Sequence, residues 1–243
     1  MVAASALRRH GSIAPSGRGI TLSALDHAHR YGRSLFPSRV FDPKEVARVL
    51  KDGHQSRKIG KMVVKGHRKG WPIYTLTLEE RASCPRSCAA WSFCYGNNMQ
   101  AAERIVHGDD LIMALLYELG DLQKAHPTGF LVRLHVLGDF WSADYVNAWR
   151  AFLDCYPALA VFGFTAHPRE SEIGSLIAEI AENNWDRFAI RFSGARGELM
   201  AAQIGDDVDP MAIMCPAQTG ATDCCATCAL CWQTDRSIGF ARH

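Results

Sequence analysis

Residues 130–165, FLVRLHVLGDFWSADYVNAWRAFLDCYPALAVFGFT, decide the fold of this 243-residue chain. Two short apolar runs, 130–136 and 159–165, flank a segment in which apolar residues recur at helical spacing. Ser142 is placed to cap the N-terminus of this helix, and Pro157 closes it. A strand, a helix and a second strand in this order are typical of a βαβ unit, in which the two strands are parallel.

The same alternation continues on both sides of this unit. Apolar or alternating runs predict three further strands, and apolar stripes at helical spacing predict two further helices. The strands are expected over 73–78, 187–193 and 211–214, and the helices over 109–123 and 173–180. Units of about thirty residues each predict an α/β fold with a parallel sheet. Because five strands are too few for a closed barrel of eight, we expect a partial (β/α) barrel, with a doubly wound sheet as the alternative.

Three regions of the chain differ in composition. Residues 71–243 hold the predicted α/β domain, which also contains the cysteine clusters. Residues 1–20 contain arginine and serine but no acid, and we expect a disordered tail there. Residues 21–70 form a basic segment with two weak helical patterns, the second of which opens with the favourable pair Asp42-Pro43. These patterns extend over residues 21–35 and 43–52.

Charge is unevenly distributed along the chain. Residues 1–70 contain fifteen Lys and Arg against four Asp and Glu, whereas residues 71–243 contain twelve against twenty-one. The basic charge peaks in SRKIGKMVVKGHRKG, residues 56–70. Such a segment is suited to bind nucleic-acid phosphates or another polyanion. The alternative is a solvated basic face that docks on the acidic remainder of the same protein.

The sequence lacks the marks of a membrane or secreted protein. No run of about eighteen apolar residues is present, so no transmembrane helix and no membrane partner are expected. The apolar core of a secretory signal is also missing from residues 1–20. Nine cysteines are an odd number, which argues against a disulfide framework. We therefore expect a cytoplasmic protein in which closely spaced thiols are metal ligands or redox groups.

Eight of the nine cysteines lie in two stretches, and the C-terminal stretch supplies four candidate ligands. The even spacing of Cys225, Cys228 and Cys231 suits three thiolates around one face of a 4Fe–4S cube, with Cys215 as the fourth ligand. Cys224 adjoins Cys225, and the even spacing favours Cys225 over it. Four thiolates also bind zinc, which is the alternative, although zinc sites usually take cysteines in separated pairs.

The first stretch supplies only three thiols, Cys84, Cys88 and Cys94. Three thiolates on a 4Fe–4S cube leave one iron open to bind a substrate or a cofactor. One alternative is a zinc site completed by a histidine. Another is a single site shared with the C-terminal stretch.

Loops that leave the carboxyl ends of parallel strands gather on one face of an α/β fold, where sites are built. Both cysteine stretches follow predicted strands, and Gly138-Asp139 follows another, so we expect all of them around one mouth. Gly138 lets the backbone approach a ligand there, and Asp139 is the best candidate for chemistry. His135 within its strand is either a site residue or a hydrogen-bonded core histidine. Arg133 and Arg191 also fall inside apolar strands, where a charge needs a partner such as an anionic ligand or Asp139.

Three runs of sequence resemble the phage and bacterial "gene product eighty-eight" family. They are TLTLEERASCPRSCAAWSFCYGNNM, VRLHVLGDFWSADYVNAW and CPAQTGATDCCATCALCW, and the resemblance covers roughly residues 56–235. It implies a cytoplasmic protein with paired cysteine motifs, of a kind found in phage or mobile-element contexts.

A looser similarity points to radical S-adenosylmethionine enzymes. These place a three-cysteine loop after the first strand of a partial barrel, with an aromatic residue beside the last cysteine, and here Tyr95 adjoins Cys94. Their Gly-Gly-Glu-like turn, which binds the methionine amino group, corresponds to Gly138-Asp139, with one glycine and a shorter acid. The cysteine spacing departs from the family, since it is x3 then x5 here and x3 then x2 there. Further C-terminal cysteines that bind an auxiliary cluster are frequent in that superfamily.

The leading hypothesis is an iron–sulfur protein that resembles a radical S-adenosylmethionine enzyme, with one open and one auxiliary 4Fe–4S cluster. Asp139, His135 and Arg191 are the candidate catalytic residues, and Gly138, Asp139 and Tyr95 are expected to contact a cofactor. One alternative is a zinc-stabilised protein that binds nucleic acid through residues 56–70. Another is a redox or electron-transfer protein without catalytic activity.

Overall fold

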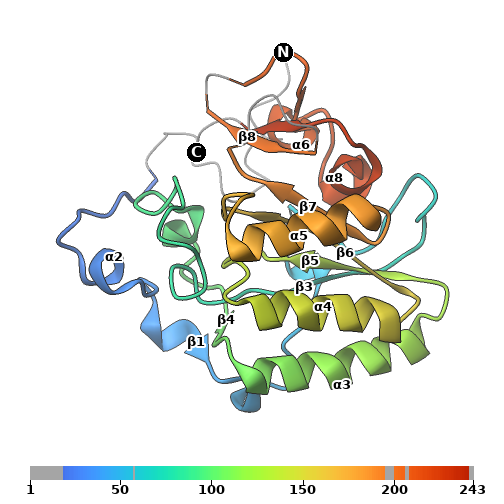
Figure 1. Cartoon of the computed structure of the whole chain (residues 1–243), viewed down its shortest axis with the longest axis horizontal. Helices are drawn as coiled ribbons and strands as arrows, with labels where there is room; N and C mark the ends of the chain where they lie inside the picture. The colour runs from blue at the N-terminus through green and yellow to red at the C-terminus, as the bar shows by residue number, and fades with distance from the viewer. Residues whose placement is uncertain (1–18, 57, 195–199, 206–207, 241–243) are drawn as a thin grey trace.

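A five-stranded sheet forms the centre of the molecule (Figure 1). The computed structural model describes residues 19–56, 58–194, 200–205 and 208–240. The strands of this sheet are, in spatial order, β2 (Lys51–Asp52), β3 (Ile73–Thr75), β5 (Phe130–Leu134), β6 (Leu159–Thr165) and β7 (Phe188–Phe192). β2 is antiparallel to β3, and the other four strands are parallel. The α/β class and the parallel sheet predicted from the sequence are confirmed.

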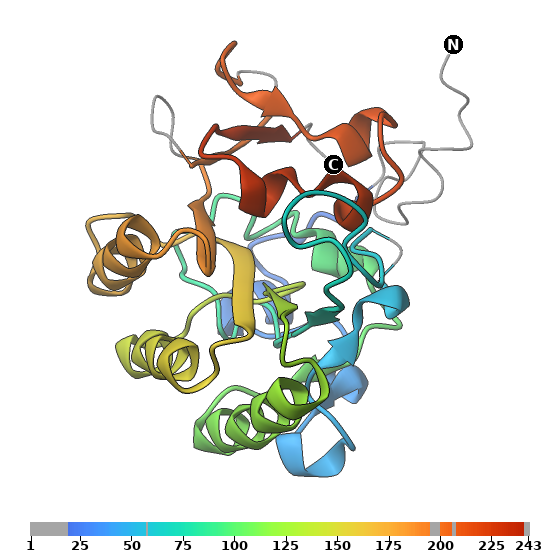
Figure 2. The ribbon, with the colours of Figure 1, turned by 90° about the vertical axis from the view of Figure 1, so that its right-hand side faces the viewer.

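Three helices cover one face of the sheet (Figures 1 and 2). They are α3 (Asp109–Ala125), α4 (Ala143–Cys155) and α5 (Glu172–Asn183). As expected, the Ser142 side chain caps α4 by accepting a hydrogen bond of 3.1 Å from the backbone N–H of Tyr145. The helices pack on alternate strand residues such as Val132 and Val161. Parallel strands that follow one another in chain order bring each crossover helix back to the same side.

The other residues of each strand face the opposite side and form a second core. Leu131, Ala160, Phe162 and Ala189 lie there because side chains alternate along a strand. The C-terminal segment covers this face with two short helices, α7 (Cys225–Cys228) and α8 (Leu230–Gln233), and a third, α6 (Pro216–Thr219), packs against α7 and β9 (Ile213–Met214). Trp232 of α8 packs on Phe162 with ring centroids 4.5 Å apart. The second thiol stretch therefore lies over the face of the sheet.

The strand predicted over residues 211–214 does not join the central sheet. It appears as β9 (Ile213–Met214) in a separate parallel sheet with β8 (Ala202–Ile204) and β10 (Ile238–Phe240). The prediction that the chain contributes five parallel strands to one sheet is wrong in this respect. The reason is that β9 hydrogen-bonds to β10, a strand formed by residues at the far end of the chain.

Residues 19–70 contain much less helix than their pattern predicts. They form α2 (His27–Tyr31), three short 3-10 turns and the strands β1 (Val40–Phe41) and β2. Gly32 ends α2 in a left-handed conformation. The Asp42-Pro43 cap is present, but the Glu118 carboxylate of α3 then accepts the backbone N–H groups of Val49 and Leu50 at 2.6 and 2.9 Å. These bonds draw the chain into β2 instead of a helix. The tail predicted over residues 1–20 lies almost wholly outside the described residues.

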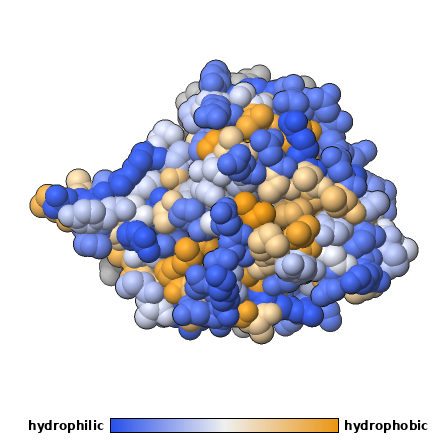
Figure 3. Space-filling model, turned by 60° about the horizontal axis from the view of Figure 1, so that its bottom comes forward, coloured by the Kyte–Doolittle hydropathy of each residue, from blue (hydrophilic) through white to orange (hydrophobic). Residues whose placement is uncertain are grey.

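The surface below the helices is mixed in character. Figure 3 shows this underside, where hydrophobic side chains lie in separate groups between polar ones. Within the described ranges, no helix is both long and apolar enough to cross a membrane.

Candidate functional site

The first cysteine loop lies beyond the carboxyl end of β3, as expected. Cys84, Cys88 and Cys94 are half-buried there, and burial raises the pKa of each thiol, that of Cys94 to about 11. The other two thiols further raise the pKa of Cys84. Tyr95 follows Cys94, and burial raises the pKa of its hydroxyl.

A buried ion pair holds the loop. Nε of Arg104 donates to Oε2 of Glu80 at 2.7 Å, and both side chains are inaccessible to solvent. The same guanidinium donates to the carbonyls of Gly96, Met99 and Ala102 at 3.1, 3.1 and 2.7 Å. Arg104 therefore fixes the backbone immediately after Cys94. An ion pair with this many hydrogen bonds holds both of its charges in place.

Two further charged residues support the same loop. Arg81 has a positive φ of 64°, donates from Nε to the carbonyl of Trp91 at 3.1 Å and hydrogen-bonds to Asn97. Glu79 pairs with Arg33 at 2.8 Å. Sequence reasoning missed this network. The signal was the run Glu79-Glu80-Arg81 directly after an apolar strand, where three charged residues need partners.

Asp139 lies at the carboxyl edge of the sheet beside the first loop. Its carboxylate accepts the backbone N–H groups of Phe140 and Ala166 at 2.8 and 2.7 Å and also bonds to Thr165. Burial raises the pKa of Asp139, and its charge in turn raises the pKa of Cys84. Asp139 therefore ties the ends of β5 and β6 together.

Gly138 is required for close packing. Its φ is +87°, and a Cβ atom there would lie 2.5 Å from Oγ of Ser83 and 2.6 Å from Cβ of Leu78. The glycine thus lets the turn after β5 approach the first loop. The close contact that Gly138 permits therefore joins the turn after β5 to Leu78 and Ser83.

His135 and Arg191, two of the candidate catalytic residues, each have hydrogen-bond partners within the protein. Nε2 of His135 hydrogen-bonds to the Tyr145 hydroxyl at 3.0 Å in the core beneath α4, and burial lowers the pKa of His135 to about 3. Arg191 is completely buried on the opposite face of the sheet. It donates to four carbonyls of the C-terminal segment, among them that of Cys231 at 3.1 Å.

The second thiol set surrounds a small cavity. Cys215, Cys225, Cys228 and Cys231 all line it. The space between the lining atoms is about 270 Å³ with its opening to solvent, and the centre of a water molecule reaches about 10 Å³ of it. Cys224 faces elsewhere, with its Sγ 3.7 Å from Oγ1 of Thr227. The structure thus brings together the four thiols that sequence spacing selected.

Positive charges surround these four thiols. Burial raises the pKa of Cys231 to about 11, and the charges of Arg191 and Arg133 oppose this rise. Burial also raises the pKa of Cys225, and the charge of Lys58 opposes that rise. Arg133 is 9% exposed, stacks over Phe164 with its guanidinium carbon 4.4 Å from the ring centroid, and forms no ion pair with any described residue. The second thiol set is therefore the more electropositive of the two.

The described side chains form no group that is ready to hold a single metal ion. No three His, Cys, Asp or Glu side chains among them are close enough to do so. The choice between an iron–sulfur cluster and a zinc ion stays a prediction from the cysteine spacing.

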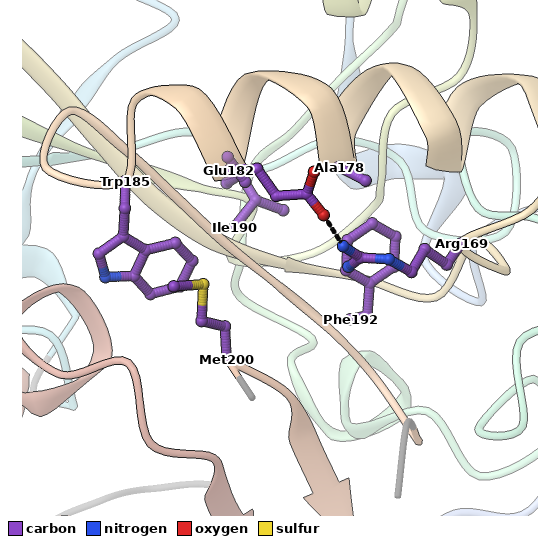
Figure 4. Close-up of a pocket in the computed structure, with 8 residues that line it drawn as sticks. Arg169, Ala178, Glu182, Trp185, Ile190, Phe192 and Met200 are labelled. Atoms are coloured by element: carbon purple, nitrogen blue, oxygen red, sulfur yellow. Dashed lines mark hydrogen bonds and ion pairs between the residues drawn. The ribbon is translucent and has the colours of Figure 1, made fainter. Parts of the chain in front are cut away.

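A larger hollow lies away from both thiol sets (Figure 4). It lies between α5 and β7, and the centre of a water molecule reaches about 360 Å³ of it, compared with about 10 Å³ in the thiol cavity. Trp185 and Met200 line it on one side, and the ion pair of Arg169 with Glu182 lies across from them. No cysteine contributes to its lining, so this hollow gives no support to a metal site.

Comparison with protein-family models, with curated proteins and with solved structures finds no match to this chain. The resemblances described above therefore stay predictions from the sequence motifs.

Proposed function

We propose that this protein binds iron–sulfur clusters. In this proposal Cys215, Cys225, Cys228 and Cys231 hold a complete 4Fe–4S cluster. The observation that carries it is the cavity lined by these four thiols beside Arg133 and Arg191, two buried cations that form no ion pair with a described carboxylate. A cluster with four thiolates is an anion, and it would supply the missing negative charge.

The first loop would hold a second cluster on Cys84, Cys88 and Cys94. With three protein thiolates, one iron keeps a coordination position for a substrate or cofactor, and S-adenosylmethionine is the candidate from the motif similarity. The Glu80–Arg104 pair fixes the loop in place, and Asp139 holds the ends of β5 and β6 next to it. This chain's own residues thus position the thiols.

The strand order supports a partial (β/α) barrel as the architecture. β3, β5, β6 and β7 follow one another in chain order, with α3, α4 and α5 on one face. A doubly wound sheet would instead reverse its strand order and place the helices that connect its strands on both faces. In barrels of this kind the loops at the carboxyl ends of the strands form the site, which is where the first thiol loop lies.

Anaerobic purification followed by iron, sulfide and zinc analysis tests the proposal. We expect about eight irons and eight sulfides per chain for two 4Fe–4S clusters. Replacing Cys84, Cys88 and Cys94 with serine should remove about half of each, and so should replacing Cys225, Cys228 and Cys231. The matched control is Cys224→Ser, which should keep the full content. Colourless protein with stoichiometric zinc and no sulfide would contradict the proposal.

A further inference from the structure

Residues 61–73 form a projecting hairpin, here called the basic hairpin. The backbone N–H of Val63 donates to the carbonyl of Trp71 at 2.9 Å, and that of Gly70 donates back to Val63 at 2.8 Å. An antiparallel bridge joins Met62 to Pro72. Gly66 and Gly70 have φ values of +79° and +92°, which allow the tight reversal between the two arms.

The basic hairpin presents positive charge and some apolar surface to solvent. Lys61, Lys65 and Lys69 are all exposed, and no acid occurs anywhere in residues 53–78. Met62 and Val64 beside them are 46% and 54% exposed. Exposed methionine is enriched on surfaces that bind another protein.

A buried arginine adds a weakly compensated charge to the basic hairpin. Arg68 is 2% exposed, and its guanidinium lies 5.4 Å from the centroid of the Trp71 ring. Its Nε and Nη1 atoms have no hydrogen-bond partner among the described residues, and it forms no ion pair with them. Burial lowers the pKa of Arg68, and the charge of Asp186 opposes this in part. A further anionic group nearby would reduce the cost of burying this charge.

The basic hairpin is bonded directly to the second thiol stretch. The backbone N–H of Val64 donates to the carbonyl of Ala226 at 3.0 Å, and Nε2 of Gln233 donates to that of Lys65 at 3.3 Å. Just before the hairpin, the carbonyl of Lys58 accepts the backbone N–H of Cys225 at 2.8 Å. Figures 1 and 2 both show the turquoise hairpin beside the red helices of the C-terminal segment.

We propose that the basic hairpin docks an acidic one-electron carrier protein, which reduces the cluster held by Cys215, Cys225, Cys228 and Cys231. The inference rests on the proposed function. In the step, the carrier's reduced centre loses one electron and the second cluster gains it, with no bond made or broken and no proton transferred. Complexes with electron-carrier proteins bury a small interface area and depend on electrostatic attraction. The exposed lysines of the basic hairpin would supply the positive charge for this attraction.

A protein partner fits this surface better than a nucleic acid. Proteins that bind single strands use exposed aromatic rings to stack the bases. Trp71 is the hairpin's single Phe, Tyr or Trp residue, and it is half-buried and lies against Arg68. His67 is exposed at the turn, and the large hydrophobic residues exposed between the lysines are Met62 and Val64, which suit a protein interface.

The test is anaerobic stopped-flow reduction of the protein by a reduced plant-type [2Fe–2S] ferredoxin, which is an acidic carrier. We expect a second-order rate constant that falls steeply with ionic strength and drops by about tenfold or more in the double variant Lys61→Glu, Lys69→Glu. The matched control reverses two lysines remote from the thiols, Lys44→Glu with Lys124→Glu, and should stay within about twofold of wild type.

Two further measurements separate the possible failures. Iron and sulfide content, and the rate of reduction by dithionite, should be equal in wild type and both double variants, because Lys61 and Lys69 do not line the cavity. Equal ferredoxin rates in all three proteins would overturn the docking inference while leaving the clusters in place. Absence of iron and sulfide from wild type would overturn the proposed function and the electron transfer together. Nucleic-acid binding by fluorescence anisotropy that is lost in Lys61→Glu, Lys69→Glu, with unchanged ferredoxin rates, would assign the basic hairpin to nucleic acid instead.

Discussion

Three polar side chains are buried in the strands or just beyond them, and they differ in how many hydrogen bonds they form. They are Arg191, His135 and Arg133. Arg191 donates to four backbone carbonyls, so its charge is well solvated by the protein. His135 avoids a charge altogether, because burial lowers its pKa to about 3. Within the described part of the chain, Arg133 has one hydrogen bond, to the carbonyl of Leu134, and its guanidinium lies over the rings of Phe162 and Phe164. Of the three, Arg133 is the residue whose environment most needs an added anion.

His135 should make the stability of the protein depend on pH. An unfolded histidine titrates near 6.5, so below about pH 6.5 the unfolded chain binds a proton that the folded protein does not. Stability is therefore full above this pH and is lost as the pH falls toward 3. Between pH 7 and pH 5 we expect a loss of about 2 kcal/mol from this residue.

Urea unfolding of wild type and His135→Gln at both pH values measures this contribution. Glutamine retains a hydrogen-bonding group for Tyr145 but does not titrate, so the variant should lose about 2 kcal/mol less than wild type between pH 7 and pH 5. The same loss in both proteins would show that His135 is not the residue responsible.

At the level of elements, the first thiol loop has little regular structure. Between β3 and β4 (Arg104–Ile105), the described elements comprise one 3-10 turn, Tyr95–Asn98. The position of the thiols depends instead on the buried charges of Glu80 and Arg104, which join the start of the loop to its end. Loss of one of these charges should therefore release the whole loop.

Glu80→Gln is the variant that tests this dependence. It leaves the buried guanidinium of Arg104 without its counter-charge, and we expect the free energy of unfolding to fall by about 3 to 5 kcal/mol. Iron bound at Cys84, Cys88 and Cys94 should fall with it. The control is Glu103→Gln, which removes an exposed carboxylate of the same loop and should change the stability by less than about 1 kcal/mol. Similar urea unfolding curves for the two variants would contradict this account.

At the level of the whole molecule, the two faces of the sheet are covered in different ways. Long amphipathic helices cover one face, with Leu115, Trp149 and Ile177 among their buried residues. Short helices separated by cysteines cover the other, and their contribution to the second core is mainly Trp232 and small alanines. These short helices of the C-terminal segment, here called the second cover, therefore bury little apolar surface of their own. We therefore expect a bound cluster to stabilise it.

Removing the second cluster should thus destabilise the protein more than removing the first. Because binding energy at such sites is also folding energy, replacing Cys225, Cys228 and Cys231 with serine should lower the free energy of unfolding by about 3 kcal/mol or more. Replacing Cys84, Cys88 and Cys94 should lower it less, since Glu80 and Arg104 still hold that loop. Anaerobic urea unfolding followed by circular dichroism compares the two triple variants. Equal losses would show that the second cover is stable without a metal group.

The sequence by itself determined the elements of this protein and the grouping of its thiols. Helical and strand periodicity predicted α3, α4, α5 and the strands β3, β5, β6 and β7, because which residues face a core depends on the local repeat of the chain. Even cysteine spacing likewise selected Cys225 over Cys224, and in the structure Cys225 lines the cavity. These properties are set by residues close together in the chain.

Only the tertiary structure decided where these parts meet. The pairing of β9 with β10 moves the second thiol stretch from the expected mouth to the face of the sheet. The same long-range packing places the basic hairpin on Ala226 and leaves Arg133 without a counter-ion among the described residues. The physical reason is that pairing partners and counter-charges are contributed by residues distant in sequence, and no local pattern records them.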